Sequence, residues 1–170
     1  MEQRYGGKDD WDAHFQYFLS YFEDERYVKI DGSPVLVLYR TKNIPDCDSM
    51  ISFWDKKCRE AGFTGIYVIE ELNSFQGEPA CSNTRAYLEF EPLYTTVYGR
   101  GLIQRTKDCL RTKIFNRRYR SQNLIFQYSD FMKQIIHRKH AVCFGKACCP
   151  GIFPDWDNTA RKGRRATIYK

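Results

Sequence analysis

The chain has 170 residues, enough for one domain with a sizeable core, and its 16% aromatic and 28% charged residues exclude an intrinsically disordered chain. A net charge of +6, from 27 basic and 21 acidic residues, is too small for a dedicated nucleic-acid-binding protein. No stretch reaches the roughly 18 apolar residues of a membrane span, and no signal peptide follows Met1, so we expect a cytoplasmic location.

The first half of the chain alternates between predicted helices and strands. A helix is predicted over residues 10–22, where aromatic and apolar side chains recur on one face. Residues 34–39 are continuously apolar, which is typical of a strand covered on both faces, as in parallel sheets. A second helix is predicted over 46–61 and ends at Gly62, and a second covered strand follows over 65–69.

The second half is assigned less completely. A third strand over 86–90 precedes a long polar stretch, 91–127, for which the pattern favours no element. A helix is predicted over 129–140, and residues 148–153 fit a fourth strand. Repeated strand–helix–strand units predict an α/β fold with a parallel sheet. Four strands then indicate either an open sheet or about half of a (β/α) barrel of the TIM type.

The seven cysteines do not point to a metal site, because their spacing fits no zinc pattern. Their odd number, without a secretion signal, argues against a disulfide framework, so we expect buried reduced thiols. G-x-G-x-x-G and P-loop patterns are absent. We therefore expect neither a metal nor a cofactor.

Polar side chains gather where the predicted strands end, which is the working edge of both α/β architectures. They are Arg40, Glu70, Glu71, Glu89, Glu91, Asp155, Trp156, Asp157, Asn158 and Arg161. Two carboxyl groups can act together at a glycosidic carbon, and aromatic faces stack on sugar rings. The set is therefore typical of carbohydrate chemistry, and it contains no convincing nucleophile–base pair.

Each candidate also has a purely structural interpretation. An unpaired carboxylate at Glu89, inside an apolar strand, would be costly to bury, so it either faces a polar site or pairs with a cation. Arg40 could be a salt-bridge partner, and Trp156 could belong to the core. Asp157 and Arg161, four residues apart, could pair with each other. Three further carboxylates are expected to be loop or surface charges: Glu70, Glu71 and Glu91.

Several segments together resemble one known family. Residues 26–34, Arg-Tyr-Val-Lys-Ile-Asp-Gly-Ser-Pro, fit the pattern R-Y-I-x-x-D-G-K-P. Residues 88–92, Leu-Glu-Phe-Glu-Pro, fit V-E-F-x-P, and residues 153–161, Phe-Pro-Asp-Trp-Asp-Asn-Thr-Ala-Arg, are close to the more specific P-G-W-D-N-T-A-R-R. In these patterns the chain resembles the WbsX-type glycosyltransferases, a family similar to glycoside hydrolase family 99.

The resemblance implies a (β/α)₈ barrel and glycosyl transfer or glycan processing in bacterial surface-polysaccharide synthesis. It also implies that Glu89 is catalytic. The residues implied to bind an oligosaccharide or nucleotide-sugar substrate are Arg40, Trp156, Asp157, Asn158 and Arg161.

Two family patterns are absent, the W-A-N-E-x-W region and the N-E-W-x-E motif whose carboxylates the resemblance implies to be catalytic. We therefore expect residues 1–170 to form one partial barrel domain that lacks the first strands and the last strand. Such a domain is expected to be inactive alone and to associate through its open sheet edges.

Two other classes of function stay open. One is a non-catalytic carbohydrate-binding remnant that holds a sugar without turning it over. The other is a module that binds nucleic acid or phosphate, for which a solvated surface is the commoner explanation. The basic residues that would carry it are Arg117, Arg118, Arg120, Arg161, Lys162, Arg164 and Arg165.

Overall fold

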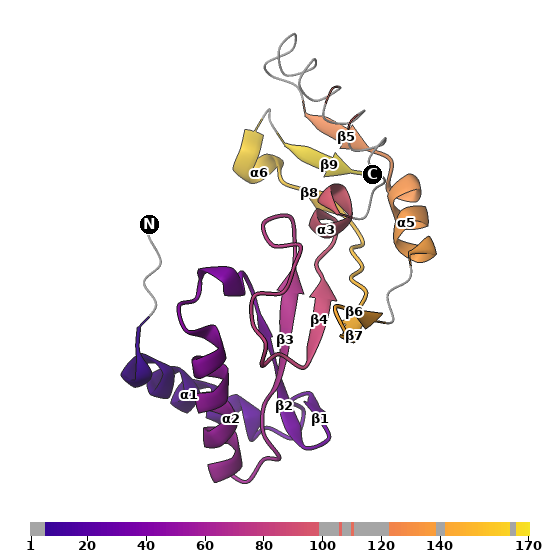
Figure 1. The fold of residues 1–170 in the computed structure, drawn as a ribbon. Helices are drawn as coiled ribbons and strands as arrows, with labels where there is room; N and C mark the ends of the chain where they lie inside the picture. Colours follow the sequence, from indigo (N-terminus) through magenta and orange to yellow (C-terminus); the bar gives the residue numbers. More distant parts are fainter. Residues whose placement is uncertain (1–5, 99–105, 107–109, 111–122, 139–141, 164–165) are drawn as a thin grey trace. The chain divides into compact units, whose positions relative to one another are not determined.

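The computed structural model describes residues 6–98, 106, 110, 123–138, 142–163 and 166–170 (Figure 1). The chain is a mixed α/β protein made of two compact units. The first unit comprises residues 1–88 and 141–149, and the second comprises residues 89–140 and 150–170. That all 170 residues belong to one partial barrel domain stays a prediction.

A six-stranded sheet with the order β1-β2-β3-β4-β7-β6 organises the first unit. Its strands are β1 (Lys29–Ile30), β2 (Ser33–Leu38), β3 (Tyr67–Leu72), β4 (Ala86–Glu89), β6 (Val142–Cys143) and β7 (Lys146–Cys149). β2 pairs with β3 in parallel, with Leu38 opposite Glu70, and β4 pairs with β7 in parallel. β1 and β6 add short antiparallel strands at the two edges. The parallel pairs confirm part of the predicted sheet.

Two helices of the first unit match the predicted ones, α1 (Lys8–Phe22) and α2 (Cys47–Glu60), and a short 3₁₀ helix, η1 (Thr41–Asn43), precedes α2. Gly62 lies just past α2 with a φ of 93°, a left-handed conformation that glycine adopts without steric cost. The amide of Phe63 then bonds back to the carbonyl of Cys58, which closes the helix end. None of the helices in the described ranges is long and apolar enough to span a membrane.

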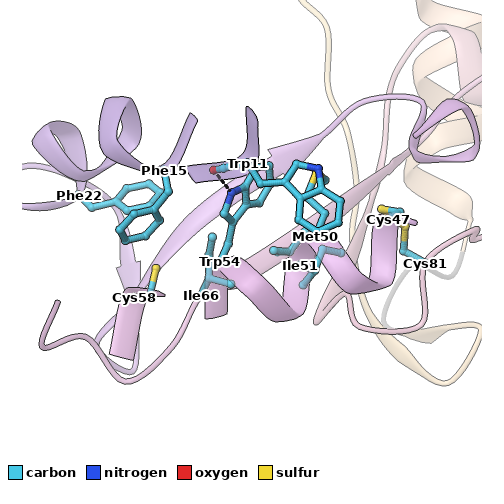
Figure 2. Packing of buried hydrophobic residues seen from close by; sticks show 11 residues of the cluster. Trp11, Phe15, Phe22, Cys47, Met50, Ile51, Trp54, Cys58, Ile66 and Cys81 are labelled. Atoms are coloured by element: carbon cyan, nitrogen blue, oxygen red, sulfur yellow. Dashed lines mark hydrogen bonds between the residues drawn. A yellow bond between two sulfur atoms is a disulfide. The ribbon is translucent and has the colours of Figure 1, made fainter. Parts of the chain in front are cut away.

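The core of the first unit is the contact between α1, α2 and the sheet (Figure 2). Trp11 and Phe15 of α1 meet Trp54 of α2, and Val68 of β3 is fully buried among the same group. The indole nitrogen of Trp54 donates a hydrogen bond to the Trp11 carbonyl at 2.8 Å. The spacing of apolar side chains along both helices therefore produces one shared core.

The second unit contains a smaller sheet and a separate aromatic core. Its elements are α3 (Leu93–Val97), β5 (Leu124–Phe126), α5 (Tyr128–His137), β8 (Trp156–Asp157), α6 (Thr159–Lys162) and β9 (Thr167–Tyr169). β9 lies between β5, to which it is parallel, and β8, to which it is antiparallel. Phe131 of α5, Phe153 and Tyr169 pack together, with the Phe131 and Tyr169 ring centroids 4.7 Å apart.

The expected fourth strand is shorter than predicted. Residues 148–153 were expected to be extended, whereas β7 ends at Cys149. Pro150 lacks the amide hydrogen that a strand position uses, and the apolar side chain of Phe153 is buried in the core of the second unit instead. The prediction is therefore confirmed for Cys148 and Cys149, which pair with β4, and wrong for residues 150–153.

The expectation of reduced thiols is wrong for three cysteines. Cys47 and Cys81 form a disulfide with a Cα–Cα distance of 6.1 Å, and Cys148 is disulfide-bonded as well. Cys58 and Cys149 are free among the described residues. Burial raises the pKa of the Cys58 thiol to about 12, which makes it unreactive.

The indole hydrogen bond of Trp54 should contribute measurably to stability. In Trp54→Phe a ring remains but the donor to the Trp11 carbonyl is lost, so we expect the free energy of unfolding to fall by about 1 kcal/mol. Trp54→Ala also opens a cavity and should cost roughly 3–5 kcal/mol. Urea unfolding followed by circular dichroism measures both, and equal stability of Trp54→Phe and the unchanged chain would contradict the assignment.

Candidate functional site

Glu89, the residue expected to be catalytic, is the last residue of β4 and is only 2% exposed. Its Oε2 accepts a hydrogen bond from Nη2 of Arg138 at 2.6 Å. The same nitrogen donates to Oε1 of Glu91 at 2.7 Å. One guanidinium, directly after α5, therefore bridges two carboxylates that lie two residues apart. Of the two interpretations that burial allows for Glu89, the structure contains the pairing with a cation.

Glu91 was expected at the surface and is instead 4% exposed, so that expectation is wrong. Its Oε1 accepts from the Thr95 hydroxyl at 2.5 Å, and its Oε2 accepts from the Thr95 amide at 3.1 Å. Nη1 of Arg138 donates to the same hydroxyl at 2.6 Å. Glu91 thus fixes the first turn of α3, where backbone amides lack helical partners. Sequence reasoning missed this role because the donors are only visible once α3 has formed.

The cluster of Glu89, Glu91, Thr95 and Arg138 lies below the surface and carries charge. Desolvating ions is costly, and charge-assisted hydrogen bonds at 2.6–2.7 Å offset that cost only when the geometry holds. The ring of Tyr94 lies 5.1 Å from the guanidinium carbon of Arg138. Burial raises the pKa of the Tyr94 phenol, and the charge of Glu89 raises it further. Nε of Arg138 is buried and has no hydrogen-bond partner among the described residues.

The segment after β7 approaches the backbone of Glu89 closely. A Cβ atom placed on Gly151 would lie 1.9 Å from the carbonyl oxygen of Glu89, so only glycine fits there. The ring of Phe90 meets that of Trp156 edge-on, with centroids 6.5 Å apart. Trp156 is half-buried in β8. The structure therefore places Trp156 beside the residue that follows Glu89.

The remaining residues of the predicted site lie around β8 and α6. Oδ1 of Asn158 accepts a bond from the Thr167 amide at 2.8 Å, which ties the segment to β9. Oδ1 of Asp157 accepts from the Thr159 amide at 2.8 Å, and in the described part of the chain Asp157 and Arg161 form no ion pair. Asp157 and Arg161 are both exposed. Their side chains are accessible to a ligand.

Glu70 and Glu71 were expected to follow the second strand as loop charges, and the structure contradicts this. Both lie inside β3, and they are 0% and 8% exposed. The Glu70 carboxylate is met by neutral donors, namely the Thr41 hydroxyl, the Gln76 amide at 2.6 Å and the Ala80 backbone amide at 2.7 Å. Glu70 therefore ties two loops to the end of β3.

Arg40 follows β2 in the first unit, whereas the other residues of the predicted site lie in the second unit. Its guanidinium lies over the ring of Phe75, and it was not found in a salt bridge among the described residues. That Arg40 shares one rim with Glu89 and Trp156 stays a prediction.

No group of three or more metal-ligating side chains is found in the described ranges. His14 and His137 lie on helices α1 and α5. His140 and most of the basic residues of the nucleic-acid alternative fall outside the described ranges, namely Arg117, Arg118, Arg120, Arg164 and Arg165.

Replacing Arg138 should lower the free energy of unfolding. In Arg138→Met the two buried carboxylates lose their shared cation, and we expect a loss of roughly 3 kcal/mol in the free energy of unfolding. Lys133→Met is the matched control, because it breaks an exposed pair with Asp130 and should cost less than about 1 kcal/mol. Urea unfolding measures both losses. Equal losses in the two variants would contradict the claim that the buried pairs of Arg138 stabilise the fold more than an exposed pair does.

Glu71 should make stability depend on pH. Burial raises the pKa of its carboxyl group, so the unfolded chain loses the proton before the folded chain does. The free energy of unfolding therefore falls as the pH rises from the pKa of Glu71 in the unfolded chain to its higher pKa in the folded chain. At pH values above both, the loss is complete and constant. Glu71→Gln should raise the melting temperature at about pH 7 and change it much less at about pH 4. A melting temperature that Glu71→Gln changes equally at both pH values would contradict this.

Comparisons with known proteins place the chain in a family. The sequence profile of a family described as "Glycosyltransferase WbsX" matches residues 1–170. Two proteins are described as "Uncharacterized protein WxcX" and come from strains B100 and ATCC 33913 of Xanthomonas campestris pv. campestris. They are 21% and 22% identical to this chain. Each alignment covers 99% of this chain and 22% of the relative, so the chain spans less than a quarter of the length of these relatives. No solved structure matches the chain. The chain belongs to the WbsX glycosyltransferase family.

Proposed function

We propose that the chain contributes the sugar-binding part of a carbohydrate-active enzyme, which acts in glycosyl transfer or glycan processing during bacterial surface-polysaccharide biosynthesis. Family membership supports the class of substrate, an oligosaccharide or a nucleotide sugar. The observation that carries the proposal is the buried Glu89 at the end of β4, fixed by Arg138 in the same unit as Trp156. A carboxylate and an aromatic ring in one site are a common arrangement for holding a pyranose.

Each residue of the site has a proposed role. Trp156 stacks on the apolar face of a sugar ring, and Glu89 accepts hydrogen bonds from ring hydroxyls or acts on the glycosidic bond. The exposed side chains of Asp157 and Arg161 bond to further hydroxyls, together with Asn158. The N-E-W-x-E carboxylates implied by the family resemblance are absent from these 170 residues, so we propose that the chain alone binds a glycan without cleaving or transferring it.

We also propose that β2, β3, β4 and β7 are successive strands of a (β/α) barrel of the TIM type, of which the chain holds about half. Their order in the sheet is their order in the chain. A barrel is built in this way, whereas a doubly wound sheet reverses its strand order at a switch point. In a barrel, the end of β4 that carries Glu89 is the working end.

A non-catalytic carbohydrate-binding role is the second candidate. Arg138 meets Glu89 and Glu91 with charge-assisted hydrogen bonds, and the Thr95 hydroxyl and amide occupy both oxygens of Glu91. With its charge paired in this way, Glu89 is suited to accepting hydrogen bonds from hydroxyl groups rather than to moving protons. This observation favours binding without turnover.

Glu89→Gln should abolish glycan binding while the chain stays folded. Titration calorimetry with mannose-containing oligosaccharides should show at least a tenfold loss of affinity, because a charge-assisted hydrogen bond is lost. Glu91→Gln is the matched control, since it disturbs the same arginine without touching the proposed ligand. Unchanged affinity in Glu89→Gln would count heavily against the site. Equal losses in both variants would show that the cluster acts only through the fold.

A further inference from the structure

Arg40 adopts an uncommon backbone conformation at the end of β2. Its φ of 51° lies in the left-handed region, which residues other than glycine seldom occupy. The Asn43 amide bonds to the Arg40 carbonyl at 2.9 Å, which fixes this turn at the start of η1. Such conformations persist when their surroundings hold them, and they are often found at ligand sites.

The guanidinium of Arg40 lies against aromatic rings and has no polar partner in the part of the chain that the structure describes. Its central carbon lies 3.7 Å from the ring centroid of Phe75 and 5.1 Å from that of Tyr39, both within cation–π range. Among the described residues Arg40 makes no hydrogen bond or ion pair through its side chain, and its Nε is buried. A buried donor without a partner is costly. Stacking uses the face of the guanidinium and Nε is buried, so the donors left for a ligand are the two terminal nitrogens, Nη1 and Nη2.

A buried hydrogen-bond network connects the segment that carries Arg40 to the segment that carries Phe75. The Glu70 carboxylate accepts hydrogen bonds from Thr41, the neighbour of Arg40, and from Gln76, the neighbour of Phe75. The Lys42 amide also donates to Oε1 of Gln76 at 3.0 Å. Because the network is fully buried, the position of the guanidinium on the ring is fixed before any ligand arrives.

Both rings beside the guanidinium are open to solvent. Phe75 is 62% exposed and Tyr39 is 48% exposed, which leaves apolar faces next to an unpaired cation. Guanidinium edges match the geometry of carboxylates and phosphates, and exposed aromatic faces take sugar rings or bases. The ligand that fits is an oxyanion attached to a ring.

We propose that Arg40, Phe75 and Tyr39 form a binding site for the oxyanion of an anionic substrate. The oxyanion is either the phosphate of a nucleoside-diphosphate sugar or the carboxylate of an acidic sugar, with the attached ring against the exposed aromatic side chains. This inference rests on the proposed function and deepens it, because it states the charge of the substrate.

The test is titration calorimetry of the chain with uridine diphosphate and, separately, with an oligosaccharide that contains glucuronic acid. We expect one of the two to bind, and its identity distinguishes phosphate from carboxylate. Arg40→Gln should weaken that binding about tenfold or more, and Arg40→Lys should weaken it less because the charge remains. Arg26→Gln is the matched control, since Arg26 is exposed in the same unit and pairs with Asp24, so it should leave the affinity unchanged.

Binding of neither anion would overturn the inference, as would equal affinity in the unchanged chain and in a folded Arg40→Gln variant. Circular dichroism melting identifies which variants are folded. The outcome is separable from that for the proposed function, which depends on Glu89 and neutral glycans. If neutral glycans bind and anions do not, only the site at Arg40 fails. If anions bind through Arg40 and Glu89→Gln changes nothing, only the proposed role of Glu89 fails.

Discussion

Buried carboxylates in β3 and at the end of β4 impose the main constraint on this structure. A carboxylate removed from water needs donors, and Glu70 and Glu89 take theirs partly from distant segments, at Thr41 and Arg138. Glu70 of β3 is met by neutral groups of two loops, whereas Glu89 and Glu91 share the guanidinium of Arg138. Each carboxylate therefore holds in place the segments that donate hydrogen bonds to it.

The regular elements follow from local patterns, so much of the first unit could be predicted from the sequence. Apolar periodicity predicts α1 and α2, and continuous apolar runs predict β2 and the first part of β3. β3 was predicted too short, because the charges of Glu70 and Glu71 suggest the end of a strand unless their partners are known. The short strands β5, β8 and β9 could not be predicted, since two or three residues carry no periodicity.

The candidate site was predictable only in part, because its partners come from distant positions. The pattern around Glu89 correctly required a cation or a polar site, but Arg138 lies 49 residues away and nothing near it marks it as the partner. The disulfide joins Cys47 and Cys81 across 34 residues, which cysteine counting could not reveal. Trp156, Asp157 and Asn158 are named through their family pattern; the structure adds that Trp156 contacts Phe90, and their role in sugar binding stays a prediction.

The central claim is that a glycan lies against Glu89 and Trp156 in the second unit. Chemical-shift mapping of the ¹⁵N-labelled chain during titration with a mannose-containing oligosaccharide tests it most directly. We predict that the largest shifts fall on the amides of Glu89 and Phe90, on the indole of Trp156 and on the Arg138 side chain. Shifts confined to the first unit, or no saturable shifts in a folded chain, would contradict the claim.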